Sequence, residues 1–264
     1  MEVRDLLSAI RDSTRETVGS RKAVAVAYSG GLDSSIVARI AGEFSNVKCY
    51  TAAFPGSYDH ASVGSLAREE SVNIELLTLD AEGLVPLMTE ASRVLGSRDP
   101  IRISYTVPIL CAIEGCLEDL LLIGSGADEL FGGYAKYSSM ADPAGAMSSD
   151  FEKALAELNG LEIAAAHRGK HIGAPLASPQ VRAVAEDIPI LDKVRGMERK
   201  IALRAVAKEL GLPSHSRPKK AAQYSSGALK EMKRLAGSRH MSLSDWTAAI
   251  LNHELTPRQS VQSP

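Results

Sequence analysis

The apolar positions along the chain follow two spacings, which predict strands and helices in alternation. Short apolar runs, with the length and composition of buried strands, occur at 22–28, 47–54, 72–79 and 119–126. Between and beside them, apolar residues three or four positions apart predict helices over 3–18, 34–44, 59–71, 81–95 and 106–118. Strands that alternate with helices form a parallel sheet with helices on both faces. The sequence therefore predicts a doubly wound α/β fold.

The pattern changes near residue 138. The stretch "SSMADPAGAMSSD" (138–150) is rich in Ser, Ala, Gly and Pro and predicts a mobile loop that closes over a bound substrate. The spacing beyond it predicts helices at 150–159, 178–186, 196–210, 225–236 and 242–253, with loops at "GKHIGAPLASP" and "PSHSRPKKAAQYSSG". We therefore expect an α/β core over residues 1–138, a mainly helical part of the same domain over 139–264, and a disordered tail over 256–264.

Composition narrows the class of protein. The 264 residues carry 30 basic and 32 acidic side chains, so no overall basic field attracts nucleic acid. None of the three cysteines belongs to a CxxC pair, which argues against a zinc ribbon or a redox dithiol. The first residues are too charged for a signal peptide, and no apolar run approaches the ~18 residues of a membrane span. We expect a cytoplasmic protein that does not enter a membrane.

The first strand ends in the stretch "YSGGLDSS" (28–35), which combines two glycines with hydroxyl groups. The glycines at 30 and 31 allow a sharp turn and a close approach of the backbone to a ligand. The amide groups of the following helix then point at an anion. The stretch predicts a phosphate-binding loop, and it is not of the Walker A type because no Gly-Lys-Ser/Thr follows.

Two carboxylates occupy similar positions after two strands. Asp33 follows the first strand, and Asp128 lies in "GSGADELFGGY" (124–134) after the fourth. If these strands are neighbours, both acids face one crevice, where Mg²⁺ would bind them together with phosphate oxygens. A second interpretation stays open for each acid, and for Glu129 beside Asp128, because first-turn acids also complement a helix dipole.

Three motifs carry a resemblance to a known family. "SGGLDSS" resembles the pyrophosphate loop (PP-loop) of the N-type ATP pyrophosphatases, and "GADELFGGY" resembles the synthetase domain of asparagine synthetases and of β-lactam and carbapenam synthetases. "MERKIALRAVAKELGLPSHSRPKKAAQYSSG" (197–227) is similar to the late helix and Arg-x-Lys loop of that family. The resemblance implies an AMP-forming ligase, which adenylates a carboxylate with ATP and passes the acyl group to an amine.

The resemblance also implies roles for individual residues. Ser29, Gly30, Gly31, Ser34 and Ser35 would hold pyrophosphate, and Asp33 and Asp128 would bind Mg²⁺. The adenosine would be flanked by Tyr28, Ala52, Ala53, Phe54, Ile123 and Gly124. Lys219 would neutralise charge that develops on the phosphates, which makes it a catalytic candidate beside the two acids. Without the resemblance, the simplest interpretation is a solvated basic loop that contains Arg217, Lys219 and Lys220.

Departures from the family pattern point to a different substrate. The asparagine synthetases have Ser-Gly-Glu-Gly where this chain has Ile123-Gly124-Ser125-Gly126, so a glutamate implicated in handling the second substrate is a serine. The Arg-x-Pro-Phe-Leu-Asp element becomes "GAPLAS" (173–178) and loses both charges. We therefore expect a carboxylate other than aspartate. The glutaminase half of the family is missing, so ammonia would come from solution or from a partner protein; a homodimer stays open.

Two other classes of function remain as alternatives. A PP-loop enzyme that modifies a tRNA base would suit the small size and the basic loop, although the near-neutral charge argues against nucleic acid. An ATP-binding subunit without turnover would suit a chain that keeps the nucleotide loop and has lost substrate groups.

Overall fold

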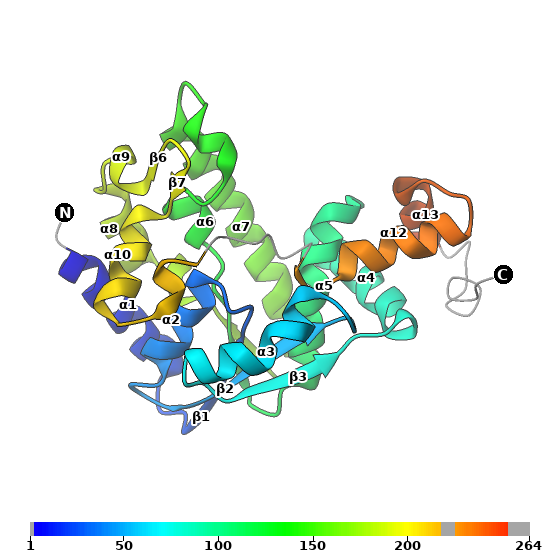
Figure 1. Ribbon diagram of the computed structural model, residues 1–264, viewed down its shortest axis with the longest axis horizontal. Coiled ribbons are helices and arrows are strands. Elements are labelled where there is room, and N and C mark those ends of the chain that lie inside the picture. The colour runs from blue at the N-terminus through cyan, green and yellow to red at the C-terminus, as the bar shows by residue number, and fades with distance from the viewer. Residues whose placement is uncertain (1–2, 218–224, 253–264) are drawn as a thin grey trace.

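The computed structural model describes residues 3–217 and 225–252 and contains a parallel sheet, whose first three strands lie in the lower part of Figure 1. The strands are β1 (Ala23–Ala27), β2 (Asn46–Ala53), β3 (Ile74–Thr78), β4 (Leu120–Leu122) and β5 (His171–Gly173). Their order is β3-β2-β1-β4-β5, and every neighbouring pair is parallel. The predicted doubly wound α/β fold is confirmed. The order reverses at β1, which pairs with β2 on one side and β4 on the other.

Helices cover both faces of the sheet because the strand side chains alternate in direction. Val24 and Val26 of β1 pack into one core, with the helices α1 (Val3–Val18), α2 (Leu32–Ala41), α8 (Pro179–Glu186) and α10 (Ile201–Glu209). Ala25 between them packs into a second core, with α4 (Ala81–Leu95), α5 (Pro100–Gly115), α12 (Ala228–Ser238) and α13 (Leu243–Leu251). The long helix α7 (Pro143–Ala166) contributes to both cores.

Shorter elements connect these layers. They are α3 (Tyr58–Glu69), α6 (Ala127–Leu130), α9 (Ile190–Lys193), the 3₁₀ turns η1 (Ala135–Ser138), η2 (Pro175–Ala177) and η3 (Pro213–His215), and a hairpin of β6 (Val194–Arg195) with β7 (Glu198–Arg199). Within the described residues, no helix is both long and apolar enough to cross a membrane.

The structure differs from the expected elements at three places. Residues 143–150, expected in a mobile loop, are the first turns of α7, because Asp142 caps that helix and Pro143 occupies its first turn. Part of "GKHIGAPLASP", expected as a loop, is the edge strand β5. The helix expected from 196 begins only at Ile201, after the β6–β7 hairpin. The tail 256–264 lies outside the described residues.

Candidate active site

The stretch between β1 and α2 forms a tight loop at the carboxyl end of the sheet. Gly30 has a φ of +66°, which a residue with a side chain rarely adopts. The backbone N–H of Ser29 donates to Oγ of Ser34 at 3.3 Å, and this hydroxyl in turn donates to the Gly31 carbonyl at 3.2 Å. Gly31 is the N-cap of α2, whose first amides are free of a side-chain cap. The loop can therefore bind an anion through backbone N–H groups.

Asp33 and Asp128 converge at this loop, and a lysine lies between them. Lys200 Nζ is 2.8 and 2.7 Å from the two carboxylate oxygens of Asp33 and 2.8 Å from Oδ1 of Asp128. The lysine side chain is 4% exposed, whereas each carboxylate is 25% exposed. The expectation that the two acids face one crevice thus agrees with their positions. Lys200 was not among the predicted site residues.

Burial alone would lower the pKa of Lys200, but the charges of Asp128 and Asp33 outweigh burial and hold this pKa above its ordinary value. The ammonium group is therefore charged, and the cluster of two carboxylates and one ammonium carries one net negative charge. Lys200 reaches this place because its backbone adopts the left-handed conformation at φ 56°, between β7 and α10. A non-glycine residue in that conformation is strained, and such strain is common at functional sites.

Two glycines permit the close packing of these acids. A Cβ at Gly124 would lie 2.8 Å from Cβ of Asp33. At Gly133 a Cβ would lie 1.7 Å from Oδ1 of Asp128 and 2.5 Å from Cε of Lys200. A side chain at either position would push a charged group out of the cluster.

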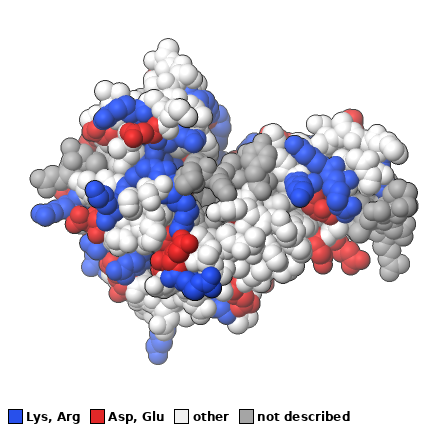
Figure 2. Space-filling model, in the orientation of Figure 1, with Lys and Arg blue, Asp and Glu red and all other residues white. Residues whose placement is uncertain are grey.

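A small basic cavity of about 160 Å³ lies on one side of the acids. Its lining includes Ser29, Gly30 and Gly31 of the loop and four cations, Arg199, Lys200, Arg204 and Arg217, against three acids, Asp33, Asp59 and Asp128. Arg217 Nη1 donates to the Gly30 carbonyl at 2.5 Å, so this guanidinium is packed on the loop rather than solvated. In Figure 2, blue side chains gather over the half of the molecule that carries α10. The size and charge of the cavity suit a phosphate or pyrophosphate group.

Lys219, the predicted catalytic lysine, lies outside the described residues. Arg217, at the end of the described part, and Ser226, after the gap, both contact the site: the Ser226 carbonyl accepts a hydrogen bond from the Phe54 backbone N–H at 2.8 Å.

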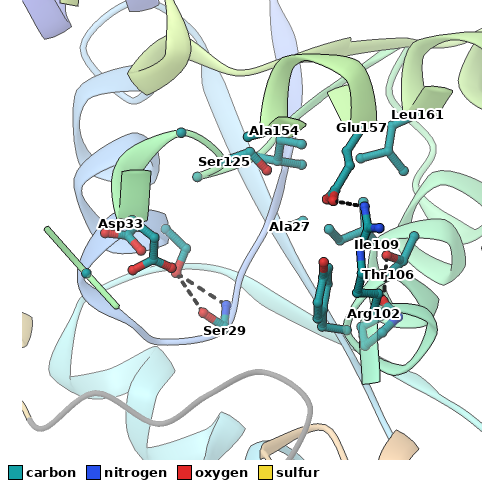
Figure 3. Close-up of a pocket in the computed structure, with 18 of the residues that line it drawn as sticks. Ala27, Ser29, Asp33, Arg102, Thr106, Ile109, Ser125, Ala154, Glu157 and Leu161 are labelled. Atoms are coloured by element: carbon teal, nitrogen blue, oxygen red, sulfur yellow. Dashed lines mark hydrogen bonds and ion pairs between the residues drawn. The ribbon is translucent and has the colours of Figure 1, made fainter. Parts of the chain in front are cut away.

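A larger cavity of about 720 Å³ opens on the other side of the acids (Figure 3). Ser29, Asp33 and Asp128 line both cavities and mark the place where the two meet. Of the predicted site residues, the larger cavity is lined by Tyr28, Ser29, Asp33, Ser34, Ala52, Ile123, Gly124 and Asp128. Ser35, Ala53 and Phe54 line neither cavity; Ser35 instead contacts the hydroxyl of Tyr28 at 3.1 Å.

The two acids fit a magnesium ion by their chemistry. Mg²⁺ usually takes one or two carboxylates and completes its shell with phosphate oxygens and water. Asp33 and Asp128 offer two partly exposed carboxylates at the junction of the cavities, beside the anion loop. The described ranges contain no group of three or more His, Cys, Asp or Glu side chains that could hold a metal ion, at the two acids or elsewhere.

The sequence departures also lie at this site. Ser125 lines the larger cavity, so the position of the family glutamate faces the space where a second substrate would bind. The "GAPLAS" element packs on the same segment, since a Cβ at Gly126 would lie 2.7 Å from Cβ of Ala177. Glu129 is buried there and accepts a hydrogen bond from the Tyr134 hydroxyl at 2.5 Å. Burial raises the pKa of this carboxyl above its ordinary value.

Comparisons with known proteins agree with the motifs. The sequence profile of the asparagine synthase family matches residues 5–171. The provisionally named asparagine synthetase [glutamine-hydrolyzing] 1 of Methanocaldococcus jannaschii is 26% identical over 273 aligned positions, which cover 86% of this chain and 50% of that protein. The chain thus spans about half the length of this relative. A solved NMN synthetase from Francisella tularensis covers 100% of the chain, and 99% of its own chain, at a TM-score of 0.45 and 10% identity. On the strength of the profile match, this chain belongs to the asparagine synthase family.

Proposed function

We propose that the protein is an ATP-dependent, AMP-forming ligase that adenylates a carboxylate and transfers the acyl group to an amine. The observation that carries the proposal is the convergence of Asp33, Asp128 and Lys200 beside the Ser29–Gly31 loop, where a basic cavity and a larger cavity meet. The basic cavity provides a place for pyrophosphate. The larger one has room for adenosine and an acyl substrate and lies within the size range of small-molecule sites.

The chemistry proposed for the site has two steps. A carboxylate oxygen of the substrate attacks the α-phosphorus of ATP, and the bond from that phosphorus to its bridging oxygen breaks, so that pyrophosphate leaves with the electron pair. The amine nitrogen then attacks the acyl carbon, the bond to AMP breaks, and the nitrogen loses a proton. The amine comes from free ammonia or from a partner protein. Both steps place negative charge on phosphate oxygens.

The residues of this chain would act mainly on that charge. The backbone amides of the first turn of α2 and the guanidinium groups around the basic cavity bind pyrophosphate, while Lys200 supplies a fixed positive charge. Lys219 is proposed to add a second one. Mg²⁺ held by Asp33 and Asp128 would neutralise phosphate charge and align the triphosphate. Positive charge aimed at developing negative charge is often the largest contribution to catalysis.

The proposal predicts ATP–pyrophosphate exchange that depends on a carboxylate but does not produce asparagine from aspartate. Serine at 125 is a poor base at neutral pH, and "GAPLAS" lacks charged partners for an amino dicarboxylic acid. The measurement is exchange over a panel of carboxylates, with and without tRNA, plus product analysis with Mg-ATP, aspartate and ammonia. Exchange that needs tRNA would favour base modification, and ATP binding without any exchange would favour a non-catalytic subunit. Asparagine and AMP formed in equal amounts at ~1 s⁻¹ or faster would contradict the substrate prediction.

The two acids provide a second test. We expect Asp33→Asn and Asp128→Asn each to lower kcat by ~10²-fold or more, because an amide keeps the shape of the side chain but lacks the charge that binds Mg²⁺. Steady-state rates over a magnesium titration would measure the effect, and circular dichroism would check the fold. Asp187→Asn, at the exposed end of α8, is the matched control. Unchanged rates and magnesium dependence in both site variants would exclude the two-acid metal site.

A further inference from the structure

The larger cavity extends away from the acids into a space between α5 and α7, which we call the α5–α7 arm. Its walls are Ile101, Arg102 and Tyr105 of α5 and Ala154, Glu157 and Leu161 of α7. Asp33 and the arm residues Arg102 and Leu161 lie at opposite ends of Figure 3, and Ala154 lies on the same side of the cavity as Ser125. A substrate whose carboxylate is next to the ATP phosphates would therefore extend its remaining atoms into the arm.

The charged side chains of the arm are already paired with one another. Arg102 Nη2 lies 2.5 Å from Oε1 of Glu157, and this hydrogen bond raises the pKa of the guanidinium further above its ordinary value. Lys136 and Lys153 lie outside these walls; they share the carboxylate of Asp150 and are at least half exposed. Within the arm, a second carboxylate on a substrate would have to compete with Glu157 for Arg102.

Beside this ion pair, the arm offers apolar surface. Ile109 and Leu161 face the cavity from the two helices, and Val94 and Leu95 at the end of α4 also line it. Leu161 is almost completely buried in the second core. Its position is therefore fixed by packing, and this part of the cavity wall is rigid. Transfer of a methylene group from water to such a surface favours binding about fourfold.

We propose that the α5–α7 arm binds the body of the carboxylate substrate and that this body is an apolar chain, so that the substrate is a monocarboxylic acid rather than an amino dicarboxylic acid. This inference rests on the proposed function, because that function places the reacting carboxylate beside the phosphates. The arm would favour apolar substrates for two reasons. A methylene group of the substrate gains contact with the apolar walls. A distal carboxylate loses its hydration and finds no unpaired cation among the described residues of the arm to replace it.

The test measures binding of matched acids to the full chain, with Mg²⁺ and a non-hydrolysable ATP analogue, by calorimetry. The probes are butanoate, hexanoate, adipate and aspartate. We expect hexanoate to bind about tenfold more tightly than butanoate, and adipate, which has the same chain length and a second carboxylate, at least tenfold more weakly than hexanoate. The proposal would be overturned if aspartate or adipate bound as tightly as hexanoate. It would also be overturned if none of the four acids bound.

Variants locate the binding. Ala154→Leu fills the arm and should weaken hexanoate binding about tenfold while leaving the affinity for the ATP analogue unchanged. Ala156→Leu, on the exposed side of the same helix, is the control and should change neither affinity. If Ala154→Leu does not fold, Ile109→Ala provides the second variant, because it enlarges the arm and should shift the preferred acid from hexanoate towards octanoate. Equal hexanoate affinity in the wild type, Ala154→Leu and Ile109→Ala would place the acid elsewhere.

The outcomes separate this inference from the proposed function. Hexanoate binding that depends on Ala154, without ATP–pyrophosphate exchange, would support the arm and contradict the ligase. Exchange with aspartate but not with the monocarboxylates would support the ligase and contradict the arm.

Discussion

Replacement of Lys200 by methionine is expected to lower turnover by ~10²-fold or more and to reduce the free energy of unfolding by about 3 kcal/mol. Methionine keeps an apolar, flexible stem but removes the ammonium group between Asp33 and Asp128. The two carboxylates then face each other without a cation. The loss of stability lies at the low end for a broken buried pair, because each carboxylate is 25% exposed and keeps some water.

Magnesium gives this prediction a readout that does not depend on the reaction. In Lys200→Met a divalent ion can replace the missing positive charge, so Mg²⁺ should raise the melting temperature of the variant more than that of the wild type. Calorimetric melting with and without Mg²⁺ measures this difference, and the same comparison on Lys208→Met, in the last turn of α10, is the control. A variant with wild-type stability and the same magnesium response would show that Lys200 does not balance the two acids.

Gly133→Ala should have the second largest effect. The new Cβ would lie within the contact distance of both Asp128 Oδ1 and Lys200 Cε, so the substitution forces the carboxylate or the lysine stem to move. We expect a destabilisation of about 1–3 kcal/mol and a loss of turnover similar to that of Asp128→Asn. Unfolding in urea measures the first effect, and initial rates at saturating ATP measure the second.

The control for this prediction is Gly237→Ala in α12, where a Cβ would meet no atom within 4 Å. There alanine should leave activity unchanged and stabilise the helix by up to about 1 kcal/mol, because glycine is a poor helix former. If Gly133→Ala behaved like Gly237→Ala, the packing around Asp128 would be looser than the structure indicates.

Four strands of the sheet could be predicted because each of them lies in a short apolar run of the sequence. The first two strands are apolar runs that end in turn residues. The pairing of β1 with β4 is the reversal of strand order that is usual in doubly wound sheets, and from the sequence it could be stated only as a condition. The edge strand β5 was missed because its three residues, His171–Gly173, carry no apolar run. It pairs with β4 through backbone atoms, and its sequence shows no sign of that pairing.

The loop expected over 138–150 shows how composition can mislead. Small residues lowered the apolar content of the stretch, although Asp142 and Pro143 together are a helix-start signal. Met147 is buried in a cluster with Tyr137 and Val194, and Phe151 is buried in the first core. These tertiary contacts cannot be read from the local pattern.

Within the candidate site, motif residues could be predicted and their counter-ion could not. The positions of Asp33 and Asp128 after neighbouring strands were enough to bring them together, since the carboxyl ends of parallel strands share an edge. Lys200 is far away in the sequence and looks like any basic residue before an amphipathic helix. The one unusual local feature of Lys200 is its left-handed backbone. That conformation could not be predicted from the sequence, because lysine has no special preference for it.

The separation of Asp33 and Lys200 along the chain has a consequence for synthesis. During translation, the first acid and the loop beside it are made early, β4 and Asp128 follow much later, and Lys200 comes later still. A nascent chain that paired β1 with β4 would bring two carboxylates together before their ammonium group exists. Such repulsion disfavours early closure of the sheet, in addition to the slow formation of distant contacts in parallel topologies. Completion of the sheet and completion of the charge cluster are therefore expected as one late event in the biogenesis of this protein.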